Sequence, residues 1–336
     1  MPVVMSRSAL AVATVATATL AGAVHAGQRP APPANAVAPA VPMFVAAPPE
    51  PAGLLSREVV ELWPAGRVPG ASAVTATRRV QERGSPEAHD RAVTGVTRPM
   101  LEVFRPETPN GAAMVILPGG GYVRLAIDKE GAGGARRMTQ VGITCFVLNY
   151  RLPIDLWESG YDAALQDVQR AVRLVRANAA TWGVDPRRIG VMGFSAGGHL
   201  AAASLTRYDA EVYAAVDAAD RQSARPDVVM LGYSFNVVGP RPNSAITVSA
   251  DTSRALDDRV RAGLAPTFLV HAADEPTVPV ANSLDMFRAL KASGVPAELH
   301  IYQEGGHGFG FSLPAGHPAS LWPDAFETWL RRLKFI

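Results

Sequence analysis

Short apolar runs of five or six residues recur along the chain from about residue 58 onward and alternate with longer amphipathic segments. Most of the runs are rich in β-branched residues and are bounded by Gly or Pro, which is typical of buried strands. They predict eight strands, at 58–62, 101–105, 113–117, 144–149, 189–194, 228–233, 267–272 and 298–302.

The segments between the later runs have the spacing of amphipathic helices. Helices are predicted at 132–141, 161–182, 196–206, 281–293 and about 319–333. In the second of these, Leu165, Val168, Val172 and Val175 recur at helical spacing, as expected of a face that packs on a sheet. The repeated strand-helix-strand order predicts an α/β protein with a mostly parallel eight-stranded sheet and helices on both faces. Residues 55–336 are expected to form one domain.

The first 54 residues have a different character. Arg7 precedes a modestly apolar run that ends in small residues at Val24 and Ala26, which is the layout of a cleavable secretory signal. We therefore predict a signal peptide at 1–26, a secreted or periplasmic location, and no stable membrane insertion after cleavage. Residues 27–54 are dominated by Ala and Pro, so a disordered leader without regular helix or strand is predicted there.

Composition narrows the chemistry. The 32 Lys and Arg residues nearly balance the 30 Asp and Glu residues, which argues against a nucleic-acid partner and favours a neutral small-molecule ligand. The single cysteine, Cys145, lies in an apolar run, so we expect a buried and unreactive thiol. No Cys-x-x-Cys or His-x-x-x-His spacing occurs, and neither a metal nor a cofactor is predicted. Side chains must then supply the chemistry. The sequence makes no prediction of oligomeric state.

One motif has the context of a catalytic nucleophile. Ser195 is the centre of a Gly-Phe-Ser-Ala-Gly pentapeptide, which follows the strand at 189–194 and precedes the helix at 196–206. A strand, a tight Gly-x-Ser-x-Gly turn and a helix form the nucleophile elbow of α/β hydrolases, where the turn exposes the serine hydroxyl. An ordinary helix-start serine is the alternative, but the context predicts that Ser195 is the nucleophile.

A serine nucleophile needs a histidine base and a carboxylate that orients it. His307 lies in a glycine-rich loop at 305–310, after the last strand, and is the predicted base. Asp274 follows the strand at 267–272 and is the predicted acid because it is nearer the strand end than its rival, Glu275. The chain order nucleophile, acid, base is the order of this fold.

The oxyanion of the intermediate needs N–H donors. The N–H of Ala196, directly after the nucleophile, is one candidate, and Gly120 and Gly121 in the Pro-Gly-Gly-Gly-Tyr loop after the strand at 113–117 are two more. Three further residues are candidates for the substrate pocket, and for two of them a purely packing role stays open. These candidates are Gly119, Tyr122 and His199, the last two of which have packing as the alternative.

Several motifs together resemble the bacterial α/β hydrolases known as acetyl xylan esterases or xylanase-associated esterases. They are Leu-Trp-Pro at 62–64, Pro-Gly-Gly-Gly-Tyr at 118–122, Asn-Tyr-Arg-Leu at 149–152, Trp-Gly-Val-Asp-Pro at 182–186 and Gly-Phe-Ser-Ala-Gly-Gly-His at 193–199. The likeness extends from about residue 58 to the C-terminus. It implies metal-free hydrolysis of short acyl esters, chiefly acetyl groups on plant polysaccharide or oligosaccharide, by a Ser-Asp-His triad.

The chain departs from the family pattern in two places. Ser234 follows Tyr233 where relatives often have a proline, and Glu275 replaces an aspartate that is commonly paired with the catalytic acid. Two other readings therefore remain beside the acetyl esterase. One is a general carboxylesterase, lipase-like enzyme or peptidase, and the other is a silent carbohydrate-binding protein on a hydrolase scaffold. The filled triad positions argue against the silent protein.

Overall fold

The computed structural model describes residues 55–56, 58–71, 74–85, 88–236 and 255–336. The predicted signal peptide at 1–26 and the predicted leader at 27–54 lie outside the described residues, and both stay predictions. Among the helices that the structure does describe, none is long and apolar enough to cross a membrane.

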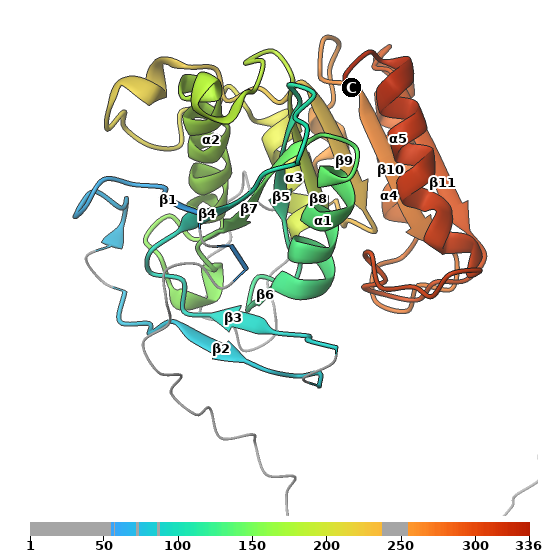
Figure 1. The fold of residues 1–336 in the computed structure, drawn as a ribbon, viewed down its shortest axis with the longest axis horizontal. Helices are drawn as coiled ribbons and strands as arrows, with labels where there is room; N and C mark the ends of the chain where they lie inside the picture. Colours follow the sequence, from blue (N-terminus) through green and yellow to red (C-terminus); the bar gives the residue numbers. More distant parts are fainter. Residues whose placement is uncertain (1–54, 57, 72–73, 86–87, 237–254) are drawn as a thin grey trace, which may run out of the picture. The chain divides into compact units, whose positions relative to one another are not determined.

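A sheet of eight strands forms the centre of the fold (Figure 1). The first two strand pairs of the sheet are antiparallel and the others are parallel. Every predicted strand is confirmed, with boundaries that differ by at most one residue at either end. The spatial order is β1 (Val59–Glu61), β4 (Met100–Phe104), β7 (Thr144–Asn149), β5 (Ala113–Leu117), β8 (Ile189–Phe194), β9 (Val228–Gly232), β10 (Thr267–Ala272) and β11 (Ala297–Tyr302).

Two hydrophobic cores lie on the two faces of this sheet. In β5, Ala113, Val115 and Leu117 belong to one core, while Met114 and Ile116 belong to the other. This alternation follows from the two-residue period of a strand, and it explains why the central strands are apolar throughout. Helices α2 (Asp162–Ala177), α3 (Ala196–Thr206) and α4 (Ala281–Ala292) contribute to the first core, and α1 (Gly133–Thr139) and α5 (Trp322–Arg332) to the second. The α/β prediction with helices on both faces is confirmed.

The helices differ from the prediction mainly at their ends. The helix α3 has the predicted bounds. The predicted helix at 161–182 ends as an α-helix at Ala177 and is followed by a separate 3₁₀ turn, Ala179–Trp182. Before α1, residues Ile127–Ala132 form a π-helical turn that the sequence pattern did not indicate.

A second, three-stranded sheet was not predicted. It consists of β2 (Arg79–Gln81), β3 (Ala92–Thr94) and β6 (Leu125–Ala126), which are too short to show an alternating pattern. Arg91 anchors it to the π-helical turn, since its guanidinium binds Asp128 in a bidentate manner at 2.7 and 2.9 Å. Figure 1 shows this sheet at the lower edge of the view, beside the carboxyl ends of the central parallel strands.

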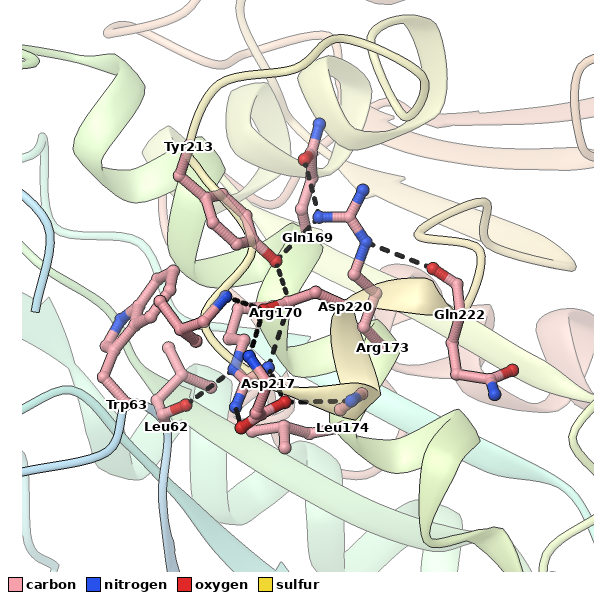
Figure 2. Close-up of polar contacts among 12 residues, drawn as sticks. Leu62, Trp63, Gln169, Arg170, Arg173, Leu174, Tyr213, Asp217, Asp220 and Gln222 are labelled. Carbon is pink, nitrogen blue, oxygen red and sulfur yellow. Dashed lines mark hydrogen bonds and ion pairs between the residues drawn. The ribbon is translucent and has the colours of Figure 1, made fainter. Parts of the chain in front are cut away.

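Buried Arg170 on α2 holds two distant segments against the helix (Figure 2). Its guanidinium donates to the carbonyl of Leu62 at 3.0 Å and to both oxygens of Asp217 at 2.8 and 2.5 Å. Asp220 lies 3.0 Å from the same guanidinium. The hydrogen bond from Arg170 keeps the pKa of Asp217 below its usual value. This cluster fixes the chain after β1 and the segment between α3 and β9 against α2.

Candidate active site

Ser195 sits in a strained turn between β8 and α3. Its backbone angles are φ 52° and ψ −116°, which L-residues rarely adopt. The flanking glycines are required by close packing: a Cβ at Gly193 would lie 2.0 Å from the carbonyl oxygen of Gly197, and a Cβ at Gly197 would lie 2.0 Å from that of Leu117. The pentapeptide is therefore the sequence that lets β8 turn sharply into α3 and raise the serine at the sheet edge.

His307 and Glu275 lie in line with the Ser195 hydroxyl. The Oγ of Ser195 is 3.0 Å from Nε2 of His307, and Nδ1 of the same ring is 2.6 Å from Oε2 of Glu275. Because a carboxylate only accepts, the Nδ1 carries the hydrogen of this bond, which leaves Nε2 able to accept from the serine. The Glu275 side chain is fully buried, and its Oε1 accepts from the N–H groups of Thr277 at 2.6 Å and Val278 at 3.1 Å.

The structure does not place Asp274 beside His307. Asp274 belongs to an exposed turn directly after β10, and its Oδ1 accepts from the N–H of Gly306 at 2.8 Å. That hydrogen bond lowers the pKa of Asp274. Glu275, the next residue, is the first to point inward after the turn. The prediction of Asp274, which rested on its nearness to the strand end, was therefore wrong. Asp274 instead holds the backbone of the histidine loop, one residue before His307.

His271 supports the segment that carries Glu275. Its Nε2 lies 2.9 Å from the carbonyl of Val278, and its Nδ1 lies 2.8 Å from the hydroxyl of Ser283. Burial lowers the pKa of His271, which favours the neutral ring that these partners require. The histidine thus fixes the loop whose Thr277 and Val278 N–H groups hold the Glu275 carboxylate.

The residues predicted to donate to the oxyanion lie close to Ser195. Gly120 and Gly121 line the same cleft as Ser195 and His307. Both adopt positive φ, 129° and 66°, which glycine tolerates and which turns the loop over the serine. Ala196 is the first residue of α3, so its N–H has no acceptor within the helix. The N–H of Gly119 is directed elsewhere, since it donates to Oε2 of Glu130 at 2.6 Å.

Glu130 is a buried carboxyl that sequence reasoning missed. It accepts from the N–H of Gly119 and, at 2.7 Å, from the hydroxyl of Tyr233 at the end of β9. The Tyr233 hydroxyl in turn accepts from the N–H of Gly310 at 3.0 Å. Burial raises the pKa of Glu130, while these two donors and the nearby His307 ring oppose the rise. One side chain therefore connects the oxyanion loop with the loop that carries His307.

Gly119, Tyr122 and His199 do not line the cleft but form a buried layer behind it. The Tyr122 hydroxyl is 2.8 Å from Nδ1 of His199, and burial lowers the pKa of His199 to about 3. The His199 ring also stacks on Phe235, with centroids 5.4 Å apart, and Phe235 does line the cleft. The packing alternative is thus the one observed for Tyr122 and His199.

The cleft has a volume of about 510 Å³ and two unlike walls. One wall is formed by Phe235, Thr277 and Val278, and the other carries charged side chains from the small sheet and its loops. Within the described segments, no group of three or more His, Cys, Asp or Glu residues is placed to hold a metal ion. Cys145 is buried on β7, as predicted.

Comparison with known proteins gives consistent relatives. The BD-FAE family model matches residues 101–231. An acetylxylan esterase of Xylanibacter ruminicola is 33% identical over 240 residues, which cover 68% of this chain and 47% of that protein. Endo-1,4-beta-xylanase B of Butyrivibrio fibrisolvens is 30% identical over 204 residues, covering 58% of this chain and 32% of that protein. The chain thus spans about half the length of the first relative and about a third of the second.

A solved structure extends the likeness to a whole protein. The crystal structure of an acetyl ester-xyloside bifunctional hydrolase from Caldicellulosiruptor lactoaceticus is 30% identical, with a TM-score of 0.65. The match covers 85% of this chain and 100% of that one. Together with the strand order and the strand-turn-helix at Ser195, this confirms the resemblance found in the sequence. The chain belongs to the α/β-hydrolase family of esterases related to acetylxylan esterases.

Proposed function

We propose that this protein is a serine esterase that removes short acyl groups, chiefly acetyl, from carbohydrate esters. The observation that carries the proposal is the line of contacts from Ser195 through His307 to Glu275, which opens on a cleft bounded by Gly120 and Gly121. A nucleophile, an oriented base and N–H donors around one cleft are the groups that acyl transfer to serine requires.

The first half of the reaction acylates the serine. Nε2 of His307 takes the Ser195 proton as Oγ attacks the ester carbonyl, and the Glu275 carboxylate stabilises the imidazolium that forms. The carbonyl oxygen becomes an oxyanion that accepts hydrogen bonds from N–H groups at Gly120, Gly121 and Ala196. When the intermediate collapses, the imidazolium gives its proton to the departing sugar hydroxyl, and the acetyl group remains on Ser195.

The second half releases the acid. His307 takes a proton from a water molecule, which attacks the acetyl carbonyl and forms a second tetrahedral intermediate. Its collapse releases acetate and returns the proton from His307 to the Oγ of Ser195. The hydrogen bonds through Glu130 hold the oxyanion loop and the His307 loop in place during both halves of the reaction, because they join the N–H of Gly119 to that of Gly310.

An ester panel tests the proposal. The purified protein should release nitrophenol from the acetate ester with a kcat/KM at least about tenfold above that for esters of eight or more acyl carbons. It should also release acetate from acetylated xylo-oligosaccharides. Ser195→Ala should abolish both activities. Retained turnover in that variant would overturn the serine mechanism, and a preference for long acyl chains or peptide amides would overturn the substrate assignment.

A further inference from the structure

The charged wall of the cleft carries more cations than anions. Arg83 and Asp90 come from the β2–β3 connection, and Arg124 and Lys129 flank β6; all four line the cleft that contains Ser195 and His307. Among the described residues that line the cleft, the one other carboxyl group is that of Glu130, which is buried and already accepts from Gly119 and Tyr233. Three basic side chains therefore face one accessible acid.

Asp90 engages two of the three cations. It lies 3.2 Å from the guanidinium of Arg83 and 3.2 Å from the ammonium of Lys129. For the third cation, Arg124, no ion pair is observed among the described residues, and its Nε is buried without a hydrogen-bond partner. A buried donor of a charged group without a partner is unfavourable, and a ligand with a matching acceptor relieves that cost. Burial, and then the repulsion of Arg83, lower the pKa of Arg124, while the charges of Asp90 and Glu130 oppose the shift.

Arg124 is also close to the reacting centre. Its N–H donates to the carbonyl of Gly120 at 3.3 Å, and its Cγ would lie 3.0 Å from a Cβ at that glycine. A group bound by the Arg124 side chain would therefore lie beside the oxyanion loop, in the cleft that also contains Ser195. A guanidinium presents paired N–H donors that match the two oxygens of a carboxylate.

We propose that Arg124 binds a carboxylate carried by the ester substrate, with Arg83 and Lys129 adding a favourable field. This inference rests on the proposed esterase function and narrows its substrate class from neutral to anionic esters. In a carbohydrate ester the carboxylate belongs either to a uronate in the sugar portion or to the acyl group. The near-zero net charge of the chain predicted a neutral ligand. Basic side chains nevertheless outnumber acidic ones in the described lining of the cleft, although the two kinds are nearly equal over the whole sequence.

The test compares anionic and neutral esters in matched pairs. For the sugar portion, acetate release is measured from acetylated xylo-oligosaccharides with and without a glucuronate residue. For the acyl portion, 4-nitrophenyl hydrogen succinate is compared with 4-nitrophenyl butyrate. The readout is the kcat/KM for the anionic ester divided by that for the neutral ester of the same pair. The two esters differ in intrinsic reactivity, but this difference is the same for every variant and cancels when a variant is compared with the wild type.

Arg124→Gln should lower the anionic-to-neutral ratio of one pair about tenfold or more, mainly through KM, as expected for loss of a charge-assisted hydrogen bond. Asp90→Asn should raise the same ratio about threefold, because it releases Arg83 and Lys129. Raising the salt concentration should reduce the wild-type ratio. The pair that responds identifies which portion carries the carboxylate.

Arg187→Gln is the matched control, because it removes one cation that is 87% exposed and precedes β8, at the opposite end of that strand from Ser195. It should leave the ratio unchanged. Ratios unchanged in Arg124→Gln, or changed equally in Arg187→Gln, would overturn the inference. Equal losses on both members of each pair would also overturn it, since they would show that Arg124 only shapes the oxyanion loop. A wild type that hydrolyses none of these esters would instead overturn the proposed function.

Discussion

Substitution of Glu275 by glutamine tests whether Glu275 or Asp274 is the acid that orients His307. The amide keeps the size of the side chain, but its oxygen is needed by the N–H groups of Thr277 and Val278, which now hold Oε1 of Glu275. The amide nitrogen must then face Nδ1 of His307, where the carboxylate oxygen lies at 2.6 Å. An N–H facing Nδ1 favours the tautomer with the hydrogen on Nε2, and that nitrogen can no longer accept the Ser195 proton.

The expected effect is large because both geometry and charge are lost at a fully buried side chain. Placing an amide behind a catalytic imidazole lowers kcat by about 10,000-fold in serine proteases, which corresponds to about 5 kcal/mol of barrier. We expect Glu275→Gln to lower kcat for nitrophenyl acetate by about 1,000- to 10,000-fold, with KM changed less than about threefold.

Asp274→Asn is the matched control. Its amide oxygen can still accept from the N–H of Gly306, and the exposed side chain does not contact the His307 ring. We expect kcat within about threefold of the wild type. Steady-state kinetics on both variants, with circular dichroism to verify folding, decide the matter. A larger loss in Asp274→Asn than in Glu275→Gln would refute the reasoning and restore Asp274 as the orienting acid.

Three further predictions concern the surroundings of the site. Glu130→Gln should lower kcat about 10- to 100-fold with little change in KM, because an amide that faces both the Gly119 N–H and the Tyr233 hydroxyl cannot satisfy both donors; equal kcat values in the two proteins would contradict this. Burial lowers the pKa of His199 to about 3 in the folded protein, from about 6.5 in the unfolded chain. Between these pH values the unfolded chain therefore binds one more proton than the folded protein. The free energy of unfolding should then fall as the pH drops from about 6.5 toward 3. Urea unfolding from pH 7 to pH 5 should show this loss in the wild type, approaching about 1.4 kcal/mol per pH unit, and a weaker slope in His199→Gln; parallel slopes would argue against a neutral buried ring. Gly197→Ala should cost about 3 kcal/mol or more of unfolding free energy, because the new Cβ would lie 2.0 Å from the Leu117 carbonyl; a melting temperature unchanged from the wild type would show that the elbow is not as tightly packed as described.

The eight strands of the main sheet were predictable because their signal is local. Each is a short apolar run between Gly or Pro residues, and burial on both faces makes the run continuous, as in β5 and β8. The small sheet carries no such signal, since β6 has two residues and β2 and β3 have three each. The pairing of β3 with β6 joins segments more than thirty residues apart, as does the contact of Arg91 with Asp128.

The candidate site was predictable where chain order alone decides it. Ser195 and His307 are marked by glycine-rich turns after strands, and the structure brings them to 3.0 Å. The choice between Asp274 and Glu275 depends on the direction in which the chain leaves a turn, which neither residue type reveals.

Glu130 shows why some functional residues leave no trace in a single sequence. Its role arises from two donors, Gly119 and Tyr233, that are 11 and 103 residues away. The cationic wall is a similar case, because Arg83 and Arg124 line the same cleft although they lie in separate stretches of the chain. Functional groups of this kind can be recognised only from a structure, which shows that residues far apart in the sequence lie close together.

The most direct measurement of the central claim is covalent labelling of the nucleophile. The full-length protein is treated with a fluorophosphonate ester and the modified peptide is identified by mass spectrometry. We expect one adduct per chain, located on Ser195, and labelling slowed about 1,000-fold or more in His307→Ala because the serine then lacks its base. An adduct on another residue, or full esterase activity in protein whose Ser195 is quantitatively modified, would contradict the account.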